Sequence, residues 1–180
     1  MAERIRIGIS SWADKTLLAS GWYPKGARDA ASRLAYYASR FPLVENDAPY
    51  YALPSERQTE LWSERTPDGF TMNVKAFALL TQHYTDPARL PADLREALPA
   101  DLEGKRRVYP KDLDPLFLAE VATRFRNSLA PLRRSGRLGL VLFQYPVWIP
   151  FGRATRELIG RRGTSCPTTA SRSSSGTRLG

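Results

Sequence analysis

Apolar and polar residues in the first part of the chain alternate with two different periods, and each period predicts a different element. RIRIGIS, residues 4–10, alternates isoleucine with polar or small residues and predicts a strand. Between Asp29 and Phe41 the apolar positions recur every three to four residues, as on one face of a helix, and Pro42 ends this element. LVEND, residues 43–47, predicts a second strand, so a helix separates the first two strands.

The same alternation of helix and strand continues through the next segment. Ser55 and Gln58 have the spacing of a capping box, which predicts the start of a helix, and TPDG at residues 66–69 is a turn signal that ends it. FTMNVKA, residues 70–76, places Phe, Met and Val on one face and Thr, Asn and Lys on the other. This pattern predicts a third strand.

The segment after the third strand predicts a long connection, a helix and a fourth strand. Residues 77–111 form a proline-punctuated excursion with one short helix in LPADLREAL. Asp114 followed by a proline predicts the start of a helix whose apolar stripe runs through residues 117–132, and Ser135–Gly136 ends it. LGLVLFQYP, residues 138–146, predicts a strand that is apolar on both faces, as buried parallel strands are.

Alternating strands and helices without a hairpin signal predict parallel β/α units and an α/β fold class. An open doubly wound sheet and a closed barrel both satisfy this pattern, but no glycine-rich phosphate loop follows the first strand. A barrel also explains the polar face of the third strand, since Thr71, Asn73 and Lys75 would point to its interior. We therefore expect a parallel (β/α) barrel of TIM type, of which about the first four β/α units are present.

Composition narrows the class of protein further. The chain has 180 residues, 42% hydrophobic and 25% charged, which fits one globular domain with a core. Cys166 is the single cysteine and His83 the single histidine, so the sequence offers neither a disulfide framework nor a Cys/His metal site. No apolar run approaches the ~20 residues of a membrane span. We expect a cytoplasmic protein with no membrane partner, and the sequence identifies no cofactor.

The net charge of +9 would suggest a nucleic-acid partner, because Lys and Arg neutralise phosphates. However, residues 153–180 carry +5 of this charge and the first 152 residues only +4. The basic character therefore belongs largely to the last part of the chain, which disfavours nucleic-acid binding by the body.

Six segments carry motifs that occur together in a known family. They are IGISSW at 7–12, WYP at 22–24, VENDAPYYALPS at 44–55, WSERTPDGFTMNVKAF at 62–77, LVLFQYPVW at 140–148 and GRATREL at 152–158. In this order they resemble the YecE-like family, also called domain of unknown function 72, whose fold is a TIM-type barrel. The resemblance covers nearly all of residues 4–159, and the family has no established activity that it could imply.

The resemblance implies that VENDAPYY is the second barrel strand and the loop after it. Active sites in such barrels lie at the carboxyl ends of the strands, which explains two carboxylates in an apolar stretch. We expect Glu45, Asp47 and Lys75 to be catalytic groups, although this chain has Asn46 and Asp47 where the family has an apolar residue and then Asn. We expect the adjoining strand ends and loop to bind substrate through Ser10, Ser11, Trp12, Tyr50, Tyr51, Gln144 and Tyr145.

Each of these side chains also has a structural interpretation. Glu45 could pair with Lys75 inside the barrel, Asp47 could cap the following loop, and the aromatic residues could be ordinary packing. Gln144 could simply finish its strand, and His83 is expected to be a solvent-facing loop residue. The basic residues of the excursion fit either a solvated loop or an anion contact: Lys105, Arg106, Arg107 and Lys111.

Residues 161–180 differ in composition from the rest of the chain, because they are almost entirely Arg, Ser, Thr and Gly. We expect either a disordered tail or a shifted reading frame that truncates the barrel. Back-translated with GC-rich codons and read two nucleotides later, the tail gives ARDELPDYRVAVEFRNATW. This string resembles the family's next helix end and its fifth strand, which favours the frameshift.

Three classes of function stay open at this point. The first is a barrel enzyme, hydrolase-like and acting on a phosphorylated or sugar-like small molecule, with Glu45 as general acid or base and Lys75 as electrostatic stabiliser. The second is a nucleic-acid or anion-binding module that uses the basic loop and tail. The third is a nonfunctional truncated product.

Overall fold

The computed structural model describes residues 5–102, 104–150, 152 and 156–157. Four strands form one sheet, in which every neighbouring pair is parallel and the order in space follows the order in sequence. The strands are β1 (Gly8–Ser10), β2 (Leu43–Asn46), β3 (Thr71–Lys75) and β4 (Leu138–Leu142). This arrangement confirms the predicted α/β class with parallel β/α units.

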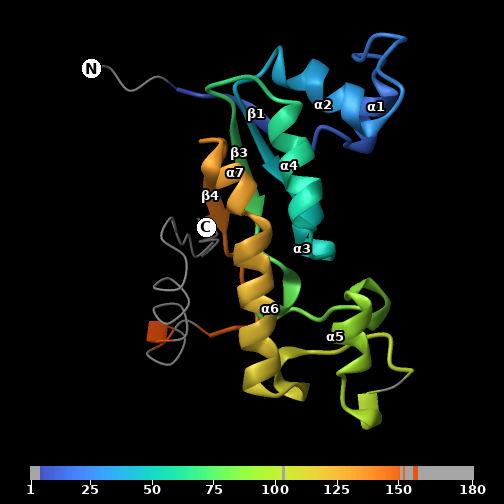
Figure 1. The fold of residues 1–180 in the computed structure, drawn as a ribbon, viewed down its shortest axis with the longest axis vertical. Helices are drawn as coiled ribbons and strands as arrows, with labels where there is room; N and C mark the ends of the chain where they lie inside the picture. Colours follow the sequence, from blue (N-terminus) through green and yellow to red (C-terminus); the bar gives the residue numbers. More distant parts are fainter. Residues whose placement is uncertain (1–4, 103, 151, 153–155, 158–180) are drawn as a thin grey trace, which may run out of the picture.

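Helices connect each strand to the next (Figure 1). Between β1 and β2 lie α1 (Lys15–Ala19) and α2 (Ala30–Ala38), and between β2 and β3 lie α3 (Ala48–Tyr51) and α4 (Glu56–Glu64). The connection from β3 to β4 holds η1 (Ala78–Thr81), η2 (Pro87–Arg89), α5 (Ala92–Glu96), η3 (Ala100–Leu102), η4 (Pro110–Asp112), α6 (Pro115–Ser128) and α7 (Ala130–Arg134). The sequence pattern did not predict the short helices α1 and α3.

The helix starts follow the capping residues that the sequence offers. Asp29 accepts a hydrogen bond from the Ser32 N–H and so forms a capping box at the start of α2. The Ser55 hydroxyl accepts from the Gln58 N–H at 3.1 Å, and Asp114 caps α6 before its proline. These side chains satisfy amide groups that have no partner within the helix, which explains why the starts could be predicted.

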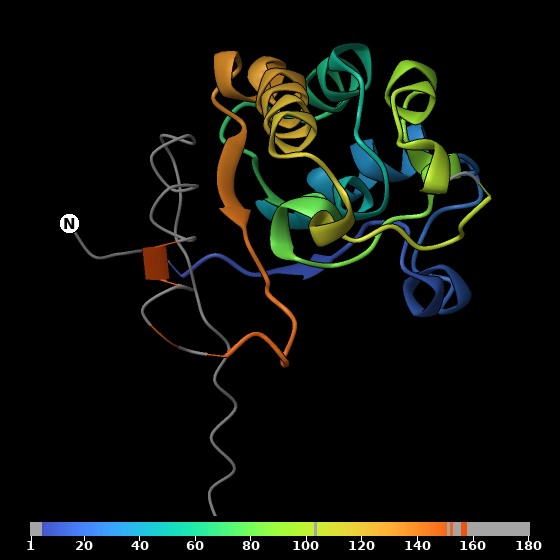
Figure 2. The ribbon, with the colours of Figure 1, turned by 90° about the horizontal axis from the view of Figure 1, so that it is seen from below.

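Helices α4, α6 and α7 lie on one side of the sheet (Figure 2). The strand side chains that face them are fully buried, and they belong to Val44, Met72, Val74 and Val141. Two helices of this layer are joined by a buried hydrogen bond from the Thr59 hydroxyl on α4 to the Ser128 carbonyl at the end of α6, at 2.6 Å. The core of the molecule therefore lies between the sheet and this helix layer.

The predicted continuous helix over residues 115–134 is interrupted. Helix α6 ends at Ser128, and α7 begins at Ala130 with Pro131 in its first turn. Proline has no N–H to donate and its ring clashes with the carbonyl four residues earlier, so a helix cannot continue through it without a break. The apolar stripe nevertheless stays buried, with Phe125 and Leu132 on either side of the break.

The opposite face of the sheet is only partly covered. Ser10 on β1 is exposed, and Glu45, Asn73 and Lys75 on β2 and β3 are half-buried. The prediction that β4 is buried on both faces is wrong, because the Leu140 side chain keeps 45% of its surface exposed. The helix layer covers only the Val141 side of this strand, so the other side forms part of the open face.

An irregularity in the pairing of β3 with β4 shapes this open face. The register shifts between Met72 and Val74, and the Asn73 Oδ1 accepts a hydrogen bond from the Leu140 N–H at 2.8 Å. A Cβ atom at Gly139 would lie 2.3 Å from that same oxygen. The close approach of the Asn73 side chain to the β4 backbone therefore requires glycine here.

Candidate functional site

Two carboxylates lie at the carboxyl end of β2. Glu45 is half-buried on the open face, and Asp47 is the residue before α3. Asp47 occupies the capping position of α3 but makes no capping hydrogen bond. Its Oδ1 is buried and has no hydrogen-bond partner within the part of the chain that the structure describes. An unpaired buried oxygen is costly and uncommon, so this atom marks a candidate ligand position.

The surroundings of Glu45 favour its protonated form. Burial raises the pKa of the Glu45 carboxyl, and the charge of Asp47 raises it further, whereas the Lys75 ammonium lowers it. These raising influences, which also include a hydrogen bond with the Asp47 side chain, outweigh the effect of the cation. The pKa of Glu45 is thus shifted in the direction that a general acid needs.

Lys75 is the last residue of β3 and lies on the same face as Glu45. Its Nζ atom is 4.8 Å from the centre of the Tyr50 ring, within the range of a cation–π interaction. Lys75 forms no ion pair with any residue in the described ranges, although Glu45 senses its charge. The ammonium group is therefore held by an aromatic face and available to a negatively charged ligand.

His83 belongs to the same neighbourhood, which the sequence did not indicate. Its ring packs edge-on against Tyr50 at 5.3 Å and against Trp148 at 6.1 Å, and its Nδ1 is 2.9 Å from the Thr81 hydroxyl. Burial lowers the pKa of His83, and the charge of Lys75 lowers it further. His83 is a loop residue, as predicted, but it is half-buried and not fully solvent-facing, because its ring packs against Tyr50 and Trp148.

The end of β1 contacts the candidate site mainly through its backbone. Ser11 has a φ of 65°, which is uncommon for a non-glycine residue, and its N–H donates to the Glu45 carbonyl at 2.8 Å. Ser10 is exposed beside Glu45, its partner in the sheet. Trp12 lies in the core, where its indole N–H donates to the Ala30 carbonyl at 3.1 Å and its ring packs edge-on against Trp62.

The structure places the predicted substrate-binding residues in different surroundings. Tyr50 lies against Lys75 and His83, and Tyr51 packs edge-on against Tyr50 with 54% of its surface exposed. Gln144 is exposed after the end of β4, and Tyr145 is half-buried against the core. The structure therefore brings Tyr50 and Tyr51 to the neighbourhood of Lys75 and leaves Trp12 in a packing position.

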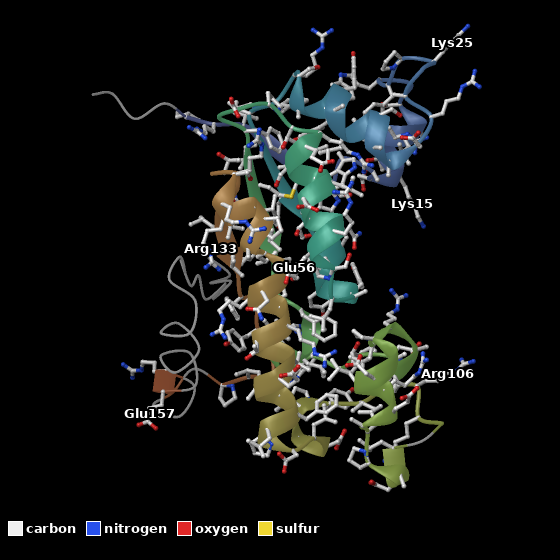
Figure 3. All side chains as sticks on the ribbon, viewed as in Figure 1. Lys15, Lys25, Glu56, Arg106, Arg133 and Glu157 are labelled. Carbon is white, nitrogen blue, oxygen red and sulfur yellow. The ribbon has the colours of Figure 1, made fainter. Side chains whose placement is uncertain are left out.

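A pocket of about 520 Å³ adjoins this neighbourhood. It lies between α3 and the excursion that follows β3, and Arg106 marks the excursion in Figure 3. Its lining residues are Tyr50, Tyr51, Ala78, Tyr84, Thr85, Asp86, Arg89, Arg106 and Arg107. The sequence left Arg106 and Arg107 either in a solvated loop or at an anion contact, and it gave no signal for Arg89 or Tyr84. Only the folding of the excursion places them beside the loop after β2.

Two features of other functional classes are lacking in the described part of the chain. No three His, Cys, Asp or Glu side chains there gather in a way that could hold a metal ion. No helix in the same ranges is long and apolar enough to cross a membrane.

Four parallel strands in sequence order, with helices on one side and polar strand ends on the other, have the arrangement of consecutive β/α units in a TIM-type barrel. The chain belongs to the family described as protein of unknown function DUF72, whose pattern matches residues 6–166. This match confirms the family resemblance of the sequence motifs. It ends within the segment 161–180 that we expect to be a tail, and that segment lies outside the described residues.

A curated relative and two solved structures agree with this assignment. The chain is 32% identical over 144 residues to the UPF0759 protein YunF of Bacillus subtilis, which is 80% of this chain but 40% of the relative. A DUF72 family protein from Enterococcus faecalis superposes with a TM-score of 0.61 at 20% identity, over 90% of this chain and 47% of the other. A DUF72 family protein from Thermotoga maritima gives 0.59 at 23% identity, over 97% and 58%.

These comparisons establish the family and the fold. The chain spans about two fifths of the length of its curated relative and about half of the solved structures. The names of the relative and of the solved structures state no activity.

Proposed function

We propose that the carboxyl ends of β2 and β3 form the acid–base centre of an enzyme, hydrolase-like, that acts on a phosphorylated or sugar-like small molecule. One observation carries this proposal: a half-buried Glu45 with a raised pKa lies beside the unpaired, buried Oδ1 of Asp47 and the charge of Lys75. Perturbed carboxyls next to a cation are concentrated at active sites, and barrels of this type bind substrates at this end of their strands.

Each group has a role that follows from its surroundings. Glu45 holds its proton and donates it to the leaving oxygen as the bond to that oxygen breaks. The free oxygen of Asp47 accepts a proton from the attacking water, so Asp47 gains one proton while Glu45 loses one. Lys75 stabilises the negative charge that develops on the substrate, since preorganised cations act strongly in a partly water-excluded site.

Structural roles alone would leave these features unexplained. A carboxylate that served only to cap α3 would bond its amide groups, whereas Asp47 does not. A purely structural Lys75–Glu45 pair would depress the pKa of Glu45, whereas burial and Asp47 raise it. The arrangement costs stability, as groups kept for chemistry commonly do.

The test is hydrolysis of a panel of sugar phosphates, with phosphate release as the readout. We expect Glu45→Gln to lower turnover by about 10²-fold or more, as the loss of a general acid does. Glu56→Gln is the matched control, because Glu56 is an exposed carboxylate in the first turn of α4 and has no role in the proposed acid–base centre (Figure 3). It should keep the turnover of the wild type.

Wild-type turnover in the Glu45→Gln variant would contradict the assignment of the general acid. Phosphate release from none of the compounds, by a chain shown to be folded, would contradict the proposal of a phosphate-ester hydrolase.

A further inference from the structure

The arginine residues around the pocket between α3 and the excursion are a second feature that the acid–base centre does not use. Three of the lining residues are Arg89, Arg106 and Arg107, and among the residues that the structure describes the pocket has one acidic lining residue, Asp86. None of the three guanidinium groups forms an ion pair with another residue in the ranges that the structure describes. Among these described lining residues positive charge thus exceeds negative charge, and no ion pair neutralises the three arginines.

Aromatic faces hold two of these cations against the pocket wall. The Arg107 guanidinium carbon lies 4.8 Å from the centre of the Tyr84 ring, and that of Arg89 lies 5.9 Å from the centre of the Tyr51 ring. Stacking on a ring leaves the N–H groups at the edge of the guanidinium plane free to bond an anion. This arrangement orients the cations without neutralising them.

The backbone of the excursion fixes these side chains relative to one another. Thr85 and Val108 exchange two hydrogen bonds, at 2.9 and 3.0 Å, and so form an isolated antiparallel bridge. This bridge joins the segment of Tyr84 to the segment of Arg107. Val108 is fully buried, and three further apolar residues of the excursion are buried as well, namely Leu90, Leu94 and Leu102. These residues belong to the hydrophobic core of the molecule, so the pocket wall is built on that core.

We propose that this pocket binds the phosphate group of a phosphorylated sugar or a similar small phosphomonoester. Guanidinium groups match phosphate oxygens in a bidentate geometry, which makes arginine the favoured residue for such recognition. A volume of about 520 Å³ is larger than a phosphate needs and leaves room for the organic part. The rings of Tyr50 and Tyr51 offer flat faces on which that part could pack.

Tyr50 connects the pocket to the acid–base centre. It lines the pocket on one side, and on the other its ring lies 4.8 Å from the Lys75 Nζ. A ligand anchored by its phosphate among the arginines would thus extend along Tyr50 toward Lys75. The inference deepens the proposed function, on which it rests only for the statement that this ligand is the substrate.

Isothermal titration calorimetry of the full chain with inorganic phosphate, glucose 6-phosphate and glucose tests the pocket. We expect the Arg106→Gln/Arg107→Gln variant to bind glucose 6-phosphate at least tenfold more weakly than the wild type, and Arg89→Gln to weaken it in the same direction. Both residues of the double variant are exposed, so the fold should survive the change, as a thermal melt verifies. The matched control is Arg133→Gln/Arg134→Gln on α7, which removes the same charge from exposed positions outside the pocket (Figure 3).

Several outcomes would overturn the inference. They are unchanged affinity in the pocket variants, an equal loss in the α7 control, or equal binding of glucose and glucose 6-phosphate. An oligonucleotide that binds through the same arginines while glucose 6-phosphate does not would assign the pocket to nucleic acid instead. Glu45→Gln should keep phosphate binding, so a failure of the acid–base proposal and a failure of the pocket proposal give different results.

Discussion

The Nζ atom of Lys75, at the end of β3, lies 4.8 Å from the centre of the Tyr50 ring on α3. This contact joins the ends of two neighbouring strands, because α3 directly follows β2. It also gives the lysine a position that is stabilised by an uncharged partner. The charge of Lys75 opposes the protonation of both Glu45 and His83, although the pKa of Glu45 is raised overall. Three titratable groups are therefore coupled at one place.

Removal of the Lys75 charge should therefore change the pKa of His83. We expect Lys75→Met to raise the pKa of His83, because a positive charge that opposes protonation is lost. The chain has a single histidine, so its ring signals in an NMR titration are unambiguous. Lys111→Met is the control, since Lys111 also lies over a tyrosine, Tyr109, but does not influence His83. An unchanged His83 titration in Lys75→Met would show that the two groups are apart.

Glu45 should make the fold less stable as the pH rises. Its pKa is raised in the folded protein, so between the ordinary value of 4.5 and the folded value the folded state binds more protons than the unfolded state. The stability that its protonation contributes is full below the ordinary value and is lost as the pH rises through the folded value. We expect Glu45→Gln to be more stable than the wild type at pH 7 and to show a flatter dependence on pH.

Urea unfolding at pH 4 and pH 7 measures this difference. Glu56→Gln, at an exposed position, should unfold like the wild type at both values. A Glu45→Gln variant that is less stable than the wild type at pH 7 would show that the ionised carboxylate stabilises the fold.

His83 should make the fold less stable as the pH falls, which is the opposite of the effect of Glu45. Its pKa is lowered in the folded protein, so the unfolded state binds more protons once the pH falls below the ordinary value of 6.5. The stability contributed by the neutral ring is then lost as the pH falls through the folded value. His83→Gln should remove this loss, which the difference between the two unfolding curves from pH 7 to pH 5 measures. Curves that stay parallel over this range would be inconsistent with the burial of the ring beside Lys75.

A side chain at Gly139 should destabilise the irregular pairing between β3 and β4. A Cβ atom there would lie 2.3 Å from the Asn73 Oδ1 and 2.5 Å from the Thr71 Cγ2. We expect Gly139→Ala to destabilise the protein by roughly 1–3 kcal/mol, as overpacking does. Gly26→Ala is the control, because no atom lies within 4 Å of its added Cβ, and it should change the stability by less than about 0.5 kcal/mol. Equal midpoints in chemical denaturation would show that the Asn73 side chain moves aside freely.

Local rules explain why the sequence predicted the elements but missed their interruptions. Asp29, Ser55 and Asp114 bond amides within three residues of themselves, so the helix starts are encoded where they occur. The period of two on β3 was also sufficient to separate buried Met72 from half-buried Lys75. The exposure of Leu140 was not predictable in this way, because it depends on which side of the sheet the distant helices cover.

By itself, the sequence determined the parallel β/α order, the helix starts and the motifs of the family, since these depend on neighbours along the chain and on side-chain period. Only the tertiary structure placed His83 against Tyr50 and aligned Arg89 with Arg106 and Arg107 around one pocket. Those residues come from an excursion without a regular period, and the packing of its buried residues into the hydrophobic core decides where they lie. The spacing of residues along the chain does not predict such contacts.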